Sequence, residues 1–203
     1  MNSIEPILTY IIKNWIELIA AFFGIASVWY SRKNNILVYP TGIISVLIYV
    51  YICMIHKLYA DAGINFYYFI MSVIGWINWT SKKEEKYVYP ISFCSKKEWA
   101  IGLGFFFGSL VILLLILSKT DSNTVVGDSL VSSSAITAMW WMANRKIESW
   151  YAWIFSNIIA LPLFYSKGLH PTVVQYFIFT ILAIWGLKTW IQIHSKENHA
   201  IKG

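Results

Sequence analysis

Several polar side chains lie inside long apolar runs of this sequence, where an unpaired polar group is costly. Asn157 lies near the middle of one apolar run, and Gln175 lies within the first turns of the next. An amide both donates and accepts hydrogen bonds, so it can bind the hydroxyl groups of a ligand or hold two helices together. We expect Asn157 to contact a ligand, whereas helix packing is an equal alternative for Gln175, Asn65 and Asn78.

Aromatic side chains form a second group that could bind a ligand, since they make up 18% of the residues. An aromatic ring that faces a cavity can stack on a flat or cationic ring, a contact that contributes about 0.5–2 kcal/mol. Most tryptophans near the ends of apolar runs are instead typical of the membrane interface. The full set of candidate binding residues is Asn157, Gln175, Asn78, Asn65, Asn144, Ser45, Tyr67, Trp76, Trp140 and Trp185.

The same apolar runs hold no acidic residue at their centres, and all four histidines lie at ends or tails. A proton-driven carrier usually needs a titratable group at membrane depth, so the pattern favours facilitated diffusion of an uncharged or delocalised ligand. The sequence also contains no G-x-x-x-x-G-K-[ST], H-E-x-x-H, C-x-x-C or G-x-S-x-G motif. We therefore expect no enzyme activity, no catalytic residue, no metal site and no cofactor.

Helices that cross a membrane must position these residues. Hydrophobic residues make up 58% of the chain and charged residues 13%, compared with about 45–50% and about 25% in soluble domains. About 20 apolar residues cross a bilayer as one helix. The apolar runs predict an all-α integral membrane protein with seven transmembrane helices, at Trp15–Tyr30, Ile36–Ile55, Ala60–Thr80, Trp99–Leu117, Val125–Ala143, Trp150–Tyr165 and Thr172–Ile193.

The distribution of basic residues predicts how these helices are oriented. Twelve Lys and Arg residues fall on one set of loops, and four fall on the other: Lys13, Lys57, Lys119 and Lys167. The richer side is expected to face the cytoplasm, which puts the N-terminus outside and the C-terminus in the cytoplasm. Because the basic residues are scattered between apolar runs, the net charge of +6 points to a lipid bilayer and not to nucleic acid as a partner.

An internal repeat becomes visible when the chain is aligned with itself, without gaps, so that its first three apolar runs meet its last three. Identical pairs in this repeat alignment include Ser45/Ser156 and Trp79/Trp190, although apolar composition alone is another source of such matches. The alignment predicts a parallel repeat of three plus one plus three helices, as in SWEET transporters. Transporters built in this way hold their ligand near the membrane midplane, between the two repeats. The predicted parts are a first repeat within residues 1–80, a polar linker and connecting helix at 81–123, and a second repeat with the C-terminal tail at 124–203.

Longer motifs in both halves resemble one known family. In the first half they are Asn35, Tyr39-Pro40-x-Gly42-Ile43-Ile44-Ser45, Leu58-Tyr59-Ala60-Asp61-x-Gly63-x-Asn65 and Gly75-Trp76-x-x-Trp79. In the second half they are Arg145-Lys146-x-Glu148-x-Trp150-x-x-Trp153, Asn157 and Lys167-Gly168-Leu169. Together these motifs resemble the nicotinamide riboside transporter (PnuC) family over about Trp29 to Trp190.

The resemblance implies a SWEET-like protein of seven helices that takes up nicotinamide riboside across the bacterial inner membrane. It also implies a homo-oligomer, a trimer, and a cytoplasmic ribosylnicotinamide kinase that traps the ligand for NAD biosynthesis. Relatives in the family carry thiamine or riboflavin, so another vitamin is an alternative substrate. A membrane scaffold or receptor that transports nothing is a further alternative.

The expected site lies between the third, fifth, sixth and seventh helices. Asn157 and Gln175 are expected to bind the sugar, and an aromatic ring is expected to stack on the base. By the resemblance to this family, Asn157 takes the place of an acidic residue that some relatives carry. An amide binds ribose hydroxyls but lacks the attraction of a carboxylate for a cationic ring, so stacked tyrosines and tryptophans would have to supply that attraction.

Overall fold

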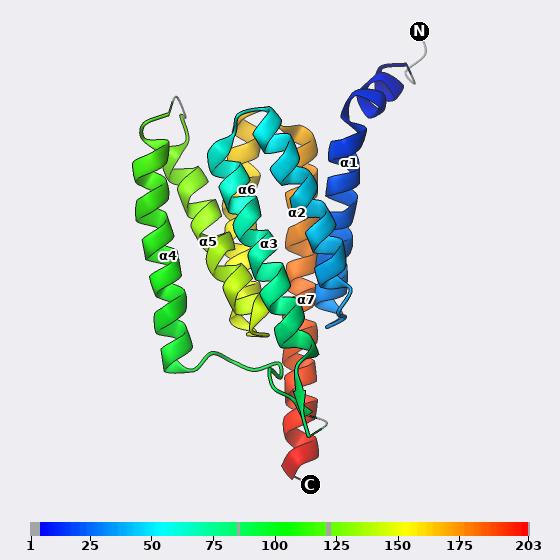
Figure 1. The fold of residues 1–203 in the computed structure, drawn as a ribbon, viewed down its shortest axis with the longest axis vertical. Helices are drawn as coiled ribbons and strands as arrows, with labels where there is room; N and C mark the ends of the chain where they lie inside the picture. Colours follow the sequence, from blue (N-terminus) through cyan, green and yellow to red (C-terminus); the bar gives the residue numbers. More distant parts are fainter. Residues whose placement is uncertain (1–4, 85, 121–122, 203) are drawn as a thin grey trace.

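The computed structural model describes residues 5–84, 86–120 and 123–202. Across these ranges, helices alternate in direction, so that α1 begins at one end of the bundle and α7 ends beyond the other (Figure 1). The seven helices of the described ranges are α1 (Glu5–Arg32), α2 (Val38–Ile55), α3 (Tyr59–Thr80), α4 (Lys96–Leu117), α5 (Val125–Ala143), α6 (Glu148–Ser166) and α7 (His170–Lys202). A short antiparallel hairpin of β1 (Lys82–Lys83) and β2 (Lys86–Tyr87) follows α3.

The start of α4 illustrates how local sequence determines a helix boundary. The apolar run predicts a start at Trp99, but the helix begins three residues earlier, after Ser95. The Glu98 backbone N–H donates to Ser95 Oγ at 3.3 Å, and the Ser95 backbone N–H donates to the Glu98 carboxylate at 2.8 Å. This capping box satisfies two backbone donors that would otherwise lack partners, so the helix begins among polar residues.

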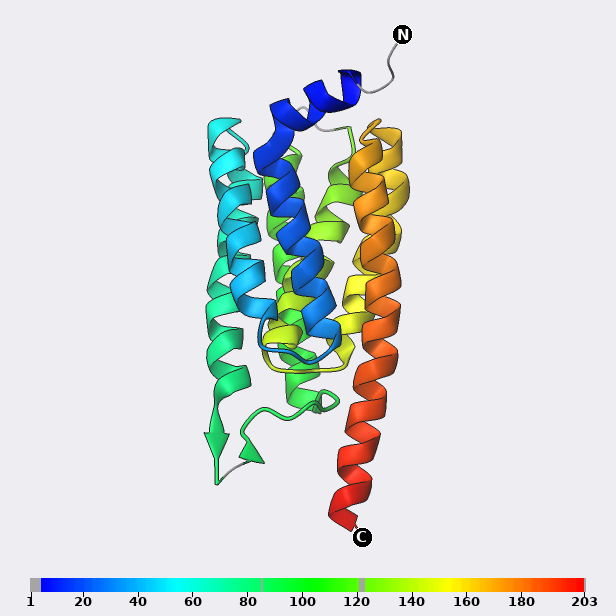
Figure 2. The same cartoon turned by 90° about the vertical axis from the view of Figure 1, so that its right-hand side faces the viewer.

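Helix α7 is much longer than the predicted apolar run, Thr172–Ile193. It contains 33 residues and is therefore about 50 Å long, compared with about 30 Å for the hydrocarbon core of a bilayer. Figure 2 shows its last turns continuing past the ends of the other helices. A hydropathy pattern ends where the residues become polar, whereas the backbone hydrogen bonds of a helix continue through them.

Among the described residues, three helical segments are long and apolar enough to cross a membrane by themselves: Val38–Ile55, Lys96–Leu117 and His170–Glu197. Helix α5 carries more polar residues, but it buries them, including Ser133, Ser134 and Thr137. The outer surface of the bundle is apolar instead, and the residues with much exposed surface include Phe22, Ile77, Phe107, Leu115 and Phe155. Apolar side chains outside and polar ones inside are the arrangement that lipid requires.

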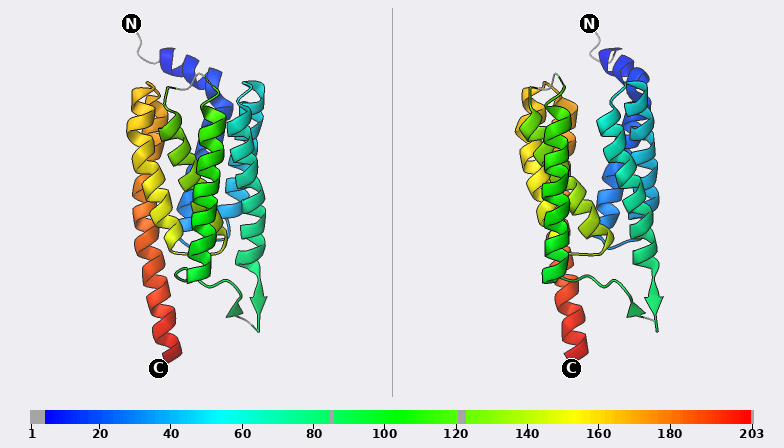
Figure 3. Two further views of the ribbon diagram at one scale, coloured as in Figure 1. Left: turned by 90° about the vertical axis from the view of Figure 1, so that its left-hand side faces the viewer. Right: turned by 60° about the vertical axis from the view of Figure 1, so that its left-hand side comes forward.

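The helices fall into two groups with α4 at the periphery. In Figure 3, α1, α2 and α3 lie on one side, and α5, α6 and α7 lie on the other. Helix α4 packs mainly on α5, where the ring of Trp99 contacts that of Trp141 with centroids 5.0 Å apart. A Cβ atom on Gly102 would overlap the Trp141 ring, so this glycine permits the close approach of the two helices.

Contacts within the first group recur in the second, at the positions that the repeat alignment pairs with them. Ser45 Oγ donates to the Ala20 carbonyl at 2.8 Å, which joins α2 to α1. Ser156 Oγ donates to the Val131 carbonyl at 2.9 Å, which joins α6 to α5. In a hydrocarbon environment a buried hydroxyl needs such a partner, so both serines stabilise a helix pair.

The turns recur in the same way. The α1–α2 turn places Asn34 at φ 51°, and the α5–α6 turn places Arg145 at φ 54°. Lys57, before α3, has φ 58°, and Gly168, before α7, has φ 72°. All four residues therefore adopt the left-handed backbone conformation, which costs a glycine least.

The linker between α3 and α4 crosses the end of the bundle and is bound to the α5–α6 turn. The Ser92 backbone N–H donates to the Arg145 carbonyl at 3.2 Å, and the Ile147 N–H donates to the Ser92 carbonyl at 3.0 Å. The Cys94 N–H donates to both oxygens of the Glu148 carboxylate, at 2.9 and 3.0 Å. Burial, reinforced by this carboxylate, raises the pKa of the Cys94 thiol.

Candidate functional site

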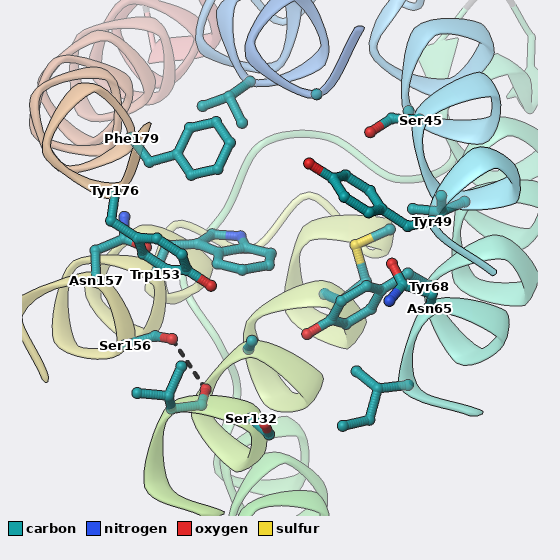
Figure 4. A pocket seen from close by; sticks show the side chains of 18 of the residues that line it. Ser45, Tyr49, Asn65, Tyr68, Ser132, Trp153, Ser156, Asn157, Tyr176 and Phe179 are labelled. Atoms are coloured by element: carbon teal, nitrogen blue, oxygen red, sulfur yellow. Dashed lines mark hydrogen bonds between the residues drawn. The ribbon is translucent and has the colours of Figure 1, made fainter. Parts of the chain in front are cut away.

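A cavity of about 670 Å³ occupies the centre of the bundle, and residues from all seven helices line it. Figure 4 shows the helices surrounding it and the side chains that point inward. The fourth helix contributes only two leucines, Leu113 and Leu117, whereas the other helices contribute polar and aromatic residues as well. The volume lies within the range of about 300–1,000 Å³ that is typical of pockets for small ligands.

Four of the ten candidate residues line this cavity: Asn157, Gln175, Asn65 and Ser45. Asn157 is only 3% exposed, in the middle of α6. Gln175 projects from α7 and faces the Tyr49 hydroxyl on α2. Asn65 Nδ2 donates to the Asp61 carbonyl in its own helix at 2.9 Å, while the Ser45 hydroxyl is bound to α1. The two amides Asn157 and Gln175 thus lie on neighbouring helices at one cavity.

The other polar candidates are bound elsewhere, where they join α3 to α5. Asn78 Nδ2 donates to the Ala143 carbonyl at 3.2 Å and to Asn144 Oδ1 at 3.3 Å. The Tyr67 hydroxyl donates to the Ile136 carbonyl at 3.0 Å. None of Asn78, Asn144 and Tyr67 lines the cavity. Their polar groups hold helices together, which is the helix-packing role left open for such groups above.

The three tryptophan candidates also lie outside the cavity. Trp76 is 40% exposed and Trp185 is 47% exposed, so both rings face the outside of the bundle. Trp140 stacks on Phe105 of α4, with ring centroids 5.6 Å apart and an interplanar angle of 30°. We therefore revise the aromatic part of the expected site, because helix rotation directs these three rings away from the centre.

Eight aromatic side chains that were not among the candidates line the cavity, and five of them surround its centre. These five are Tyr49 on α2, Tyr68 on α3, Trp153 on α6, and Tyr176 and Phe179 on α7. Figure 4 shows their rings directed toward the centre from opposite sides. The repeat alignment could have indicated two pairs of these positions. It pairs Asn65 with Tyr176 and Tyr68 with Phe179. Positions that line the cavity in one half thus correspond to lining positions in the other.

Charged residues line the cavity only near the end at which α3 and α7 begin. Among the described lining residues they are Glu17, Asp61, Asp128 and Lys167. Lys167 Nζ forms an ion pair with Asp128 Oδ1 at 2.7 Å. Glu17 and Asp61 are exposed, so this end of the cavity meets solvent and has a surplus of negative charge.

Four aromatic rings close the opposite end of the cavity. Tyr39 contacts Trp79, Trp79 contacts Trp190, and Trp190 contacts Trp150, with ring centroids 5.1, 5.6 and 5.4 Å apart. Each of these side chains is at most 1% exposed. We call these four residues the ring cluster. These packed, buried rings fill this end, which we call the closed end of the cavity.

Two hydrogen bonds connect the ring cluster across the two helix groups. Trp79 Nε1 on α3 donates to the Met142 carbonyl on α5 at 3.1 Å. Trp190 Nε1 on α7 donates to the Ser31 carbonyl on α1 at 3.0 Å. The repeat alignment pairs the two donors with each other and the two acceptors with each other, so the two bonds are equivalent. Each half of the chain therefore binds the other in the same way.

Comparison with known proteins agrees with this architecture. Residues 14–192 match the family described as nicotinamide mononucleotide transporter. The nicotinamide riboside transporter PnuC of Escherichia coli (strain K12) is 24% identical over 204 aligned positions, which cover 88% of this chain and 85% of that protein. The riboflavin/roseoflavin transporter RibM of Streptomyces davaonensis is 22% identical, with 87% and 84% covered.

A solved structure is also similar. The crystal structure of the vitamin B3 transporter PnuC superposes with a TM-score of 0.73 at 21% identity, covering 95% of this chain and 87% of that chain. These proteins are transporters and not enzymes. The family matches most of the sequence, and the outer surface of the bundle is apolar. The chain is therefore a multi-pass membrane protein that belongs to the nicotinamide mononucleotide transporter family.

Proposed function

We propose that this protein transports nicotinamide riboside, by facilitated diffusion with alternating access. The observation that carries the proposal is the central cavity, which aromatic rings and the amides of Asn157 and Gln175 line together. Asn157 and Gln175 supply hydrogen bonds for ribose hydroxyls, and Trp153 and Tyr176 supply faces on which a nicotinamide ring stacks. Proteins named as nicotinamide riboside transporters align over most of the chain.

The charge of the cavity favours the riboside over the mononucleotide. Among the described residues that line it, Lys167 is the only basic one, and it is already paired with Asp128. A phosphate group in such a cavity would meet carboxylates and no unpaired basic side chain. The pyridinium ring of the riboside is a cation, and aromatic faces attract it.

The closed ring cluster and the exposed opposite end support alternating access, since one end of the cavity is accessible and the other is not. The acidic groups Glu17, Asp61 and Asp128 lie toward the accessible end and not at membrane depth, which supports transport without proton coupling. The recurring contacts support a SWEET-like parallel repeat, with units within residues 1–80 and 124–203 joined by 81–123.

We further propose that the N-terminus lies outside and the C-terminus in the cytoplasm of a bacterial inner membrane. The 12-to-4 split of basic residues supports this orientation. A facilitator cannot accumulate its substrate, so a cytoplasmic ribosylnicotinamide kinase that phosphorylates it would trap it. A homotrimer is proposed from the family resemblance.

Riboflavin is the second candidate substrate. The observation that favours it is the similarity to RibM, which covers 87% of the chain, close to the 88% covered by PnuC of Escherichia coli. An isoalloxazine ring stacks on aromatic side chains as nicotinamide does, although it is larger and uncharged. Thiamine, which also carries a cationic ring, is a third substrate to compare.

Uptake by sealed vesicles that contain the purified protein tests the proposal. Labelled nicotinamide riboside should equilibrate across the membrane, faster than riboflavin or thiamine, and an imposed proton gradient should not change the final level. Vesicles without protein provide the control. Preference for riboflavin would transfer the proposal to that vitamin, and absence of uptake of all three would contradict a role as a vitamin transporter.

A further inference from the structure

Two crevices at the closed end of the bundle occupy equivalent places in the two halves. The first crevice lies between the α1–α2 turn, at Asn34–Ile36, and the end of α3, at Trp79 and Thr80. The second crevice lies at the positions that the repeat alignment pairs with these, between the α5–α6 turn at 145–147 and α7 at Trp190 and Ile191. In a symmetric molecule both would be equally open, but they are not.

The first crevice is hollow. It encloses about 380 Å³ and is lined by Asn34, Asn35, Ile36, Trp79, Thr80, Lys82, Tyr87 and Arg145. The contact between Tyr39 and Trp79 lies between the crevice and the central cavity, because Tyr39 lines the cavity and Trp79 lines the crevice. Their ring centroids are 5.1 Å apart. Separation of these two rings would join the two spaces.

The second crevice is filled by the linker that follows the hairpin. Ile91 is 2% exposed and belongs to the same buried cluster as Ile147 and Trp190. Its carbonyl lies 2.8 Å from His194 Nδ1 on α7. The neighbouring residue, Ser92, is hydrogen-bonded to both sides of the α5–α6 turn. The linker thus seals this half of the closed end.

We propose that the transported molecule passes the closed end through the first crevice only, and that the linker at Ile91 and Ser92 blocks the equivalent route. The inference rests on the transport function proposed above and adds the path. Opening requires Tyr39 and Trp79 to separate, which breaks the bond from Trp79 Nε1 to the Met142 carbonyl. The repeat makes the two halves equivalent, and the linker makes the route asymmetric.

The charge of the first crevice fits release better than binding of a cationic ring. The Arg145 guanidinium lies over the rings of Trp79 and Tyr87, at 4.6 and 4.5 Å from their centroids. Its Nη atoms donate to the Tyr89 and Trp79 carbonyls, at 3.1 and 3.3 Å. The aromatic faces are therefore occupied by a fixed cation, so a pyridinium ring that enters the crevice finds no free face on Trp79.

Paired cysteine substitutions test the route. In a variant without Cys53 and Cys94, Thr80→Cys places a thiol in the first crevice and Ile191→Cys places one at the equivalent position of the second. Both positions are exposed, so both should react with a maleimide that carries a bulky polymer. We expect loss of nicotinamide riboside uptake after modification of the Thr80→Cys protein and unchanged uptake after modification of the Ile191→Cys protein.

Binding of the riboside to each modified protein separates a blocked route from a damaged protein. We expect the modified Thr80→Cys protein still to bind it from the accessible end. Uptake that survives this modification, or that is lost equally in both proteins, would overturn the asymmetric route. Absence of uptake before any modification would contradict the proposed transport function itself and, with it, the route.

Discussion

Trp79 and Trp190 lie in opposite halves of the chain, yet their rings are in contact, with centroids separated by 5.6 Å. Each indole N–H donates to a backbone carbonyl of the opposite half, at Met142 and Ser31 respectively. These two acceptor residues are also in contact, since Ser31 Oγ lies 3.2 Å from Met142 Sδ. The closed end is therefore built around a local two-fold relationship, so Trp79→Phe and Trp190→Phe remove equivalent hydrogen bonds.

Replacing Trp79 by Phe should loosen the closed end. The change keeps an aromatic ring but removes the N–H donor, which costs about 0.5–1.5 kcal/mol for a hydrogen bond. A cysteine introduced at Ser45, which lines the cavity, should then react faster with a polar thiol reagent applied from the side where α7 ends. Trp190→Phe should have a smaller effect, because the linker at Ile91 and Ser92 still covers Trp190. An unchanged reaction rate in the Trp79→Phe protein would show that this bond does not keep the cavity closed.

Asn157→Leu should weaken binding of nicotinamide riboside without preventing folding, because leucine has similar bulk and suits an apolar environment. Each lost hydrogen bond costs about 0.5–1.5 kcal/mol, and an unpaired ligand hydroxyl costs about 1–3 kcal/mol more. Together these losses correspond to an affinity about tenfold to several hundredfold lower, measurable by calorimetry on purified protein.

Ser133→Ala is the matched control for this variant. Its hydroxyl donates to the Ser129 carbonyl within α5 at 2.6 Å and does not line the cavity. We expect binding close to that of the unaltered protein. Normal binding by Asn157→Leu, or failure of that variant only because it no longer assembles, would make the Asn157 amide structural.

The revised aromatic assignment can be tested with two tryptophans. Trp153→Leu removes a ring that lines the cavity, whereas Trp185→Leu removes one that faces outward and is 47% exposed. Loss of a cation–aromatic contact costs about 0.5–2 kcal/mol, so Trp153→Leu should raise the Kd by about twofold to thirtyfold. Equal Kd values for the two variants would contradict stacking on Trp153.

Gly75→Ala should destabilise the closed end, because a Cβ at this position would overlap the Tyr39 ring. Overpacking of a filled interior costs about 1–3 kcal/mol, which should lower the unfolding temperature of the protein in detergent. Gly186→Ala should behave alike, since its Cβ would overlap the Trp150 ring.

Gly63→Ala, in the same helix as Gly75, provides the control. Apart from the backbone of its own helix and its chain neighbours, no atom lies within 4 Å of the added Cβ, and alanine favours a helix over glycine by up to about 1 kcal/mol. We therefore expect an unchanged or raised unfolding temperature. A fall as large as that of Gly75→Ala would show that loss of helix flexibility, and not ring overlap, destabilises α3.

Much of the architecture could be predicted from the sequence alone. Apolar composition and the polar boundaries of the apolar runs determine the helices, because a backbone in hydrocarbon must satisfy its own hydrogen bonds. The boundaries of α5 agree with the prediction at both Val125 and Ala143. Asn157, which lies deep in an apolar run of the sequence, lines the central cavity.

Which residues face the cavity was decided only by the tertiary structure. Trp153 and Trp185 are the same residue type in similar apolar surroundings, yet one ring lines the cavity and the other faces outward. In a membrane protein, lipid and an aromatic cavity both accept apolar side chains, so residue type does not reveal the inward face of a helix. Likewise, only packing brings Asn78 beside Asn144. There Asn78 Nδ2 donates to Asn144 Oδ1, and Asn144 Nδ2 donates to the Trp140 carbonyl, so both amides are bound within the bundle.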